Sequence, residues 1–185
     1  MKRFNFKVTA LILSIVLLGS INYIYAGDLT KSIPLPDHGS LVLKFPDEWK
    51  MSVQQPGNDL PPTIRLVSSK ESKFTFLITP LWNKNTNKPF EDEQVKKLIE
   101  NDGKKMISSA IEKDFKIETF KGSSSKGYYF GLTDKAPKPN EFTYCYRVGV
   151  KVGTLLLSVT LLTNDKDSKD IKSAFEMLKN VEQAE

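Results

Sequence analysis

Two stretches of alternating apolar residues stand side by side late in the chain, at Glu141 to Val150 and Thr154 to Thr163, separated only by Lys151-Val152-Gly153. A connection this short joins two strands as an antiparallel hairpin, because parallel strands need a crossover of a dozen residues or more. Gly153 can supply the positive φ that a tight turn requires. The pair therefore predicts the centre of a mostly antiparallel sheet.

Other strand patterns come before this pair. An edge segment at Ile33 to Leu35 is followed by the turn Pro36-Asp37-His38-Gly39 and an alternating strand that stops at Pro46, which indicates a hairpin. Lys73 to Trp82 alternates clearly. Further strands are predicted at Trp49 to Val53, from Ile64 to Leu66, at Ile117 to Phe120 and at Gly127 to Thr133.

Two helices interrupt this strand pattern. Apolar residues recur at helical spacing after Glu91-Asp92-Glu93, and the pattern predicts a long central helix that ends near Lys113. A C-terminal helix is predicted around Phe175, with Asp167 or Ser168 as its cap. Strands, a long helix, strands and a short helix make an α+β class with a mostly antiparallel sheet.

The first 26 residues have the pattern of a secretory signal peptide. Lys2, Arg3 and Lys7 precede an apolar run from Val8 to Ile21, and we expect cleavage between Ala26 and Gly27. The alternative is an uncleaved membrane anchor, for which the run is short. Lipoprotein anchoring is excluded because no Cys lies near this point. We expect a periplasmic or secreted protein with a single domain over residues 27–185 and no stable membrane anchor after cleavage.

Charge and composition narrow the possible partners. The 185-residue chain has 27 Lys plus Arg and 22 Asp plus Glu, and residues 1–26 contain three of the basic ones, which leaves a net charge of +2. A chain so close to neutral has no electrostatic footprint for nucleic acid. We expect a monomer whose partner is an envelope protein or a small ligand.

Residue parity divides the predicted sheet into an apolar core face and a more polar face that is half wet or thinly covered. The core face is expected to include Phe76, Tyr128, Phe130, Leu132, Tyr146 and Val159, and the polar face Tyr129, Gly131, Cys145, Arg147 and Thr160.

Trp82, Tyr129 and Arg147 form the candidate binding surface. A guanidinium is suited to holding a carboxylate or a phosphate, and aromatic residues and Arg are enriched in binding patches. The alternatives are an exposed or ion-paired side chain for Arg147, and packing under a loop for the two aromatic residues.

No catalytic residue and no metal site are predicted. One His and one Cys cannot close a structural zinc site, and no nucleotide-binding or hydrolase motif is present. His38 is explained by turn chemistry, and Cys145 by a packed thiol, although a nucleophilic Cys145 is the alternative. In an oxidising compartment Cys145 is buried, free or paired between chains.

The acids Glu91-Asp92-Glu93 are explained by the helix start, with a cation site as the alternative, and i,i+4 pairs such as Asp92 with Lys96 are expected.

The hairpin, the segment Phe45-Pro46-Asp47-Glu48-Trp49, the long helix and the final Ser173-Ala174-Phe175-Glu176-Met177-Leu178 resemble the PsbP-like superfamily, including its DcrB-type periplasmic members. Glu48 stands where the family usually has Gly. The resemblance implies an antiparallel sheet sandwiched by helices (α/β/α) and an accessory or binding role. It implies no catalytic residue and no cofactor.

Three functions are compatible with these sequence features. The first is a non-enzymatic binding or accessory protein of the cell envelope that uses the face bearing Arg147. The second is a carrier of a small apolar ligand, with a pocket between the long helix and the aromatic sheet face. The third is a hydrolase that uses Cys145 as its nucleophile.

Overall fold

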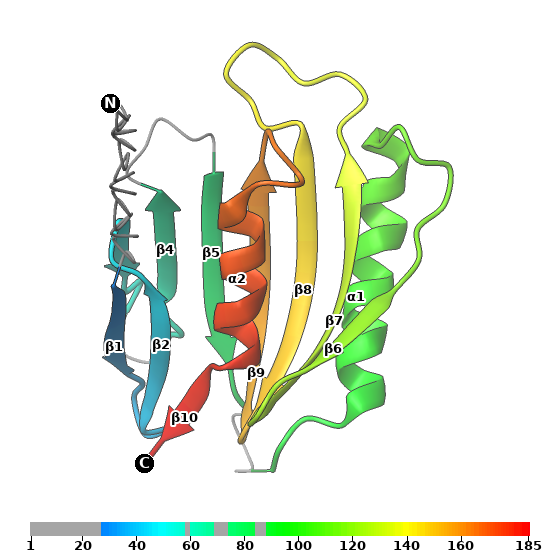
Figure 1. Ribbon diagram of the computed structural model, residues 1–185. Helices are drawn as coiled ribbons and strands as arrows, with labels where there is room; N and C mark the ends of the chain where they lie inside the picture. Colours follow the sequence, from blue (N-terminus) through cyan, green and yellow to red (C-terminus); the bar gives the residue numbers. More distant parts are fainter. Residues whose placement is uncertain (1–26, 58–59, 69–73, 84–87) are drawn as a thin grey trace, which may run out of the picture.

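A seven-stranded, fully antiparallel sheet is the centre of this computed structural model, which describes residues 27–57, 60–68, 74–83 and 88–185 (Figure 1). The signal peptide predicted at residues 1–26 lies outside these ranges. The order of the large sheet is β3-β4-β5-β9-β8-β7-β6. Its strands are β3 (Trp49–Gln54), β4 (Thr63–Ser68), β5 (Phe74–Leu81), β6 (Glu118–Lys121), β7 (Ser125–Thr133), β8 (Tyr144–Val152) and β9 (Leu155–Thr163).

A smaller sheet has the order β1-β2-β10 and joins the two ends of the described chain. Its strands are β1 (Asp28–Pro34), β2 (Ser40–Pro46) and β10 (Glu182–Ala184). The predicted hairpins are confirmed, and each turn contains a residue with positive φ, at Asp37 and Gly39 in the first and at Gly153 in the second. The strand β10 was not predicted.

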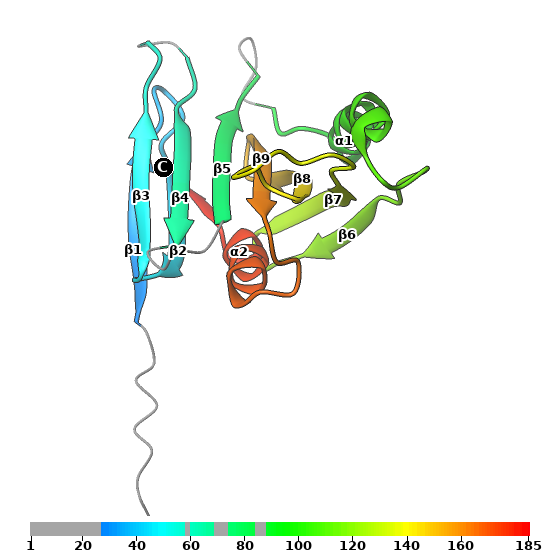
Figure 2. The same ribbon diagram turned by 90° about the horizontal axis from the view of Figure 1, so that it is seen from above.

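The two helices lie on opposite faces of the large sheet, which confirms the α+β class (Figure 2). The first, α1 (Asp92–Met106), continues as a 3-10 turn at Ile107–Ser109, and α2 (Lys169–Lys179) begins after Ser168. Ser168 is the N-cap, since its hydroxyl accepts a hydrogen bond from the backbone N–H of Ile171 at 3.3 Å.

Each face of the large sheet has its own apolar core. On one face, the small sheet and α2 enclose a core that includes Leu41, Phe45, Phe76, Val159 and Leu178. On the other, Val95 and Ile99 of α1 pack on Tyr128, Phe130, Leu132 and Leu156. The face that carries Arg147 is therefore covered by α1. Of the two expectations for this face, half wet or thinly covered, the structure contradicts the first.

Residue pairing across the sheet corrects the assignment of β7. Phe130 is the direct partner of Arg147, which in turn pairs with Thr160, so these residues share the α1 face. Tyr129 pairs with Val148 and lies on the α2 face. The parity assignment was wrong for β7 because each face of the sheet has its own core, and the buried apolar residues of β7 belong to the core under α1, whereas Val148 of β8 belongs to the core under α2.

The link between the two sheets is the turn Asp47-Glu48. Among the described non-glycine residues, only Asp37 and Asn140 have positive φ, so the turn does not require a glycine at Glu48. Trp49 follows the turn and is buried against Phe74, with ring centroids 4.9 Å apart. Its indole N–H donates to Asp170 Oδ1 at 3.0 Å and ties this turn to the start of α2.

Candidate functional site

Four half-buried aromatic rings gather on the α2 face of the large sheet, near its β6 edge. Phe120, Tyr129, Tyr146 and Phe175 come from β6, β7, β8 and α2, and are called the aromatic surface below. The centroid of Phe175 lies 4.8 Å from that of Tyr129, 5.9 Å from that of Phe120 and 6.1 Å from that of Tyr146. These separations are typical of favourable aromatic pairs.

Two glycines let these rings lie close against the sheet. A Cβ placed on Gly127 would meet the Phe120 ring, and one on Gly131 would come within 2.8 Å of the Tyr146 ring. Both glycines are in β7, in the row between β6 and β8. The rings therefore fill space that side chains of β7 would occupy, and part of each ring stays open to solvent.

Carboxylates border the aromatic surface. The Tyr129 hydroxyl donates to Glu118 Oε2 at 2.7 Å. Burial, together with this hydrogen bond, raises the pKa of Tyr129 to about 12. Burial is also the main reason why the pKa of Tyr146 is raised, and the negative charge of Asp167 adds to the shift. Both phenols stay neutral at physiological pH, beside two exposed negative charges.

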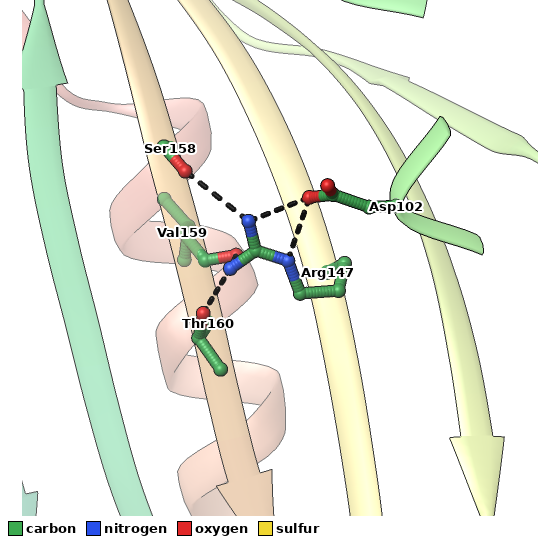
Figure 3. A network of polar contacts seen from close by, with 5 residues as sticks. All are labelled: Asp102, Arg147, Ser158, Val159 and Thr160. Carbon is green, nitrogen blue, oxygen red and sulfur yellow. Dashed lines mark hydrogen bonds and ion pairs between the residues drawn. The ribbon is translucent and has the colours of Figure 1, made fainter. Parts of the chain in front are cut away.

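Arg147 lies on the opposite face, under α1, and ties that helix to the sheet (Figure 3). Its Nε and Nη2 both donate to Asp102 Oδ2, at 3.0 and 2.7 Å. Further donations reach the Ser158 hydroxyl, the Val159 carbonyl and the Thr160 hydroxyl. Five bonds match the five N–H groups of a guanidinium, so Arg147 is engaged within the protein.

The third candidate residue, Trp82, follows β5 and packs against His38 of the first hairpin turn, with ring centroids 4.6 Å apart and the ring planes tilted by 33°. The predicted surface of Trp82, Tyr129 and Arg147 is thus divided among three places: a hairpin turn, the aromatic surface and the contact with α1. Tyr129 is half-buried beside Phe120, Phe175 and Tyr146, and Tyr146 had been predicted on the opposite face of the sheet.

Cys145 is a half-buried free thiol on the α1 face. Burial raises its pKa to about 11, and the positive charge of Arg147 only partly opposes this effect. At neutral pH the sulfur therefore stays protonated, whereas a nucleophilic cysteine works as the thiolate.

A solved structure has a similar fold. The solution structure of cyanobacterial PsbP (CyanoP) from Synechocystis sp. PCC 6803 aligns over 90% of this chain and 99% of that one, with a TM-score of 0.53 and 12% sequence identity. The fold is PsbP-like. This confirms the fold that the sequence resemblance implied. The sequence itself matches no protein-family model and no curated protein.

Two further findings concern the described part of this PsbP-like fold. No group of three or more His, Cys, Asp or Glu side chains is placed there to hold a metal ion. Nor does any helix in the same ranges have the length and apolar character needed to cross a membrane.

The loop Gly122-Ser123-Ser124-Ser125 has a role that composition did not reveal. The Ser123 N–H donates to the Lys179 carbonyl at 3.2 Å, and the Ser125 hydroxyl donates to the Leu178 carbonyl at 2.8 Å. The Ser124 hydroxyl reaches the Val181 carbonyl at 3.1 Å. The serine run thus satisfies carbonyls at and beyond the end of α2, which have no partner within the helix.

Asp92 at the start of α1 also binds the sheet, and not Lys96 as expected. Lys151 Nζ lies 2.7 Å from Asp92 Oδ1, and Lys126 contacts Oδ2. Hydrogen bonds from Lys126 and then Lys151 are the main causes that lower the pKa of Asp92 to about 2. Because the pKa in the folded state is below its ordinary value of 3.8, this stabilisation exists above about pH 4 and is lost as the pH falls towards 2.

We therefore expect Asp92→Asn to lower the free energy of unfolding near neutral pH by no more than about 1 kcal/mol, because solvent screens partly exposed pairs. Urea unfolding of both proteins from neutral pH down to pH 2 should show the difference shrink below pH 4. Glu93→Gln, on an exposed neighbouring side chain, is the control. A difference that does not change with pH would contradict the ion pairs.

Proposed function

We propose that this chain is an exported, non-enzymatic accessory protein that binds a protein partner through the aromatic surface. The observation that carries the proposal is the set of four half-buried rings bordered by Glu118 and Asp167. Tyr, Trp and Phe are enriched in protein interfaces, where they supply large contact areas at a low cost in conformational entropy. The PsbP-like fold, with the accessory roles that the sequence resemblance implies, supports the same class of function.

The charges around this surface favour a partner with basic side chains. The exposed carboxylates of Glu118 and Asp167 attract cations, and the faces of Tyr129 and Tyr146 carry the negative side of the ring quadrupole. A Lys or Arg of the partner would contact the carboxylates and the ring faces at the same place. Electrostatic complementarity of this kind increases the rate of association and selects the partner.

Export is the second part of the proposal. We propose that residues 1–26 direct the chain across a membrane and are removed between Ala26 and Gly27, which leaves the accessory protein in the periplasm or the secreted space. The protonated Cys145 thiol supports the non-enzymatic part. Mass spectrometry of the protein from its own compartment should give a chain that begins at Gly27. A chain that retains residues 1–26 would overturn this part alone.

Site-specific photocrosslinking in the source cells tests the binding surface. A benzoylphenylalanine at Tyr146 keeps an aromatic ring in the aromatic surface, and one at Val53, which is 44% exposed on the opposite edge strand β3, is the matched control. We expect a discrete crosslinked polypeptide from position 146 and none from position 53. Removing the Tyr129 ring with Tyr129→Ala should lower the yield at least about fivefold, as expected for an aromatic anchor.

Charge reversal tests the chemistry of the partner. Glu118→Lys with Asp167→Lys should suppress the crosslink at position 146, while Glu93→Lys, an exposed site on the α1 side, should leave it unchanged. Equal yields from positions 146 and 53 would refute the aromatic surface as the binding site. A crosslink only to a second copy of this chain would replace the partner with a homodimer.

A further inference from the structure

A pocket of about 340 Å³ lies beside Cys145, on the α1 face of the large sheet and opposite the aromatic surface. The end of α1, the 3-10 turn after it, the segment 142–143 and strands β7, β8 and β9 all contribute to it. Its apolar wall consists of Met106, Ala110, Leu132, Phe142, Cys145 and Leu162.

Backbone hydrogen bonds hold the walls of this pocket in place. The Lys135 N–H donates to the Ser109 carbonyl at 3.1 Å, and the Ile111 N–H donates to the Thr133 carbonyl at 2.9 Å. On the other side, the Asp134 N–H donates to the Thr143 carbonyl at 2.8 Å. The pocket is therefore part of the fold, as ligand pockets usually are before their ligand binds.

The same wall restricts the chemistry of an occupant. Six of the eleven lining residues form the apolar wall, and the Cys145 thiol among them is neutral. Ser109, Thr133 and Thr143 also line the pocket and carry no charge. Lys105 and Asp134, which also line the pocket, carry opposite charges and select neither an anion nor a cation. Burying an unpartnered charge against such a wall is unfavourable. The volume lies at the lower end of the roughly 300–1,000 Å³ that is typical of small-molecule sites.

We propose that this pocket binds a small, uncharged, apolar molecule. The sequence suggested a carrier with its pocket between the long helix and the aromatic sheet face. This pocket lies between the end of that helix, α1, and the sheet face that carries Phe130 and Leu132. The inference goes beyond the accessory role and is independent of it, because the two sites lie on opposite faces of the sheet. Failure of one therefore leaves the other standing.

Because Cys145 is the single cysteine of the chain and lies at the pocket, its alkylation reports whether the pocket is occupied. The probe is 1-naphthol. Its binding is measured by the rate at which N-ethylmaleimide alkylates Cys145 and by NMR of the methyl groups that line the pocket. We expect saturable binding, with alkylation slowed roughly fivefold when the probe is present at about four times its Kd. Shifts should be largest at the methyl groups of Met106, Ala110 and Leu132.

Ala110→Phe and Ile111→Phe form a matched pair of variants. The first adds a ring at the pocket wall, and the second adds the same ring at the adjacent position, which is 64% exposed. Ala110→Phe should abolish protection of Cys145, and Ile111→Phe should preserve it. On the unchanged chain, 1-naphthalenesulfonate, with the same rings and a charge, should bind at least about tenfold more weakly.

Three results would overturn the proposal: no saturable binding of 1-naphthol, equal affinity for the sulfonate, or undiminished protection in a folded Ala110→Phe. If that variant does not fold, the comparison of the two probes on the unchanged chain decides.

Discussion

Arg147→Ala should lower the free energy of unfolding by about 3 kcal/mol, because it leaves the Asp102 carboxylate without its partner under α1. Both side chains are only about one-fifth exposed, at 19% and 21%, so solvent replaces little of what is lost. The hydroxyls of Ser158 and Thr160 lose a donor at the same time. Denaturant unfolding followed by circular dichroism measures the change, and Arg65→Ala, on an exposed Arg of β4, is the control.

A double-mutant cycle with Asp102→Ala separates the ion pair from the other contacts of Arg147. The coupling energy should be positive and on the order of 1–3 kcal/mol, as found for residues that share one hydrogen-bond network. Arg147→Lys should recover only part of the stability, because an ammonium cannot reproduce the forked geometry. If Arg147→Ala were as harmless as Arg65→Ala, Arg147 would not stabilise the contact between α1 and the sheet. It would then again be a candidate for binding a ligand.

Tight turns explain why much of the sheet could be predicted from the sequence. The Asp37-His38-Gly39 segment and Gly153 leave room only for antiparallel pairing, and the alternation next to them then sets the register. Tyr128, Tyr129 and Phe130 show where this reasoning stops. Three consecutive aromatic residues place large rings on both faces of β7, and because both faces are covered by a core, the more apolar parity does not show which core it joins. Only the pairing of Phe130 with Arg147 decides this.

The end of α1 shows a similar limit. Helical spacing continues to Ile111 and predicted a helix to Lys113, but α1 ends at Met106 and the 3-10 turn at Ser109. Ala110 then bridges to Asp134, and the Ile111 N–H donates to the Thr133 carbonyl. These bonds to the end of β7 replace the helical ones. Because the competing partner lies more than 20 residues away, helical periodicity does not reveal it.

Long-range contacts also decide the candidate site. The aromatic surface combines Phe120, Tyr129, Tyr146 and Phe175 from four elements, and only Tyr129 was predicted. A sequence signal did exist, since Gly127 and Gly131 sit within an otherwise strong strand, and glycines there often mark a close approach by another group. These glycines do not show which ring approaches them, because that depends on the order of the strands and the position of α2.

Gly122→Ala should lower the free energy of unfolding by about 3 kcal/mol, as much as Arg147→Ala, although it adds only one methyl group. A Cβ at this position would collide with the backbone carbonyl of Lys179, which cannot rotate away as a side chain can. The collision pushes apart the loop and the end of α2, and with them the hydrogen bonds from Ser123 and Ser125. Gly57→Ala is the matched control, because a Cβ at Gly57 meets no atom of the described residues within 4 Å. It should change the free energy of unfolding by less than about 0.5 kcal/mol. Equal stabilities of the two variants in urea would show that α2 does not depend on this loop for its C-terminal cap.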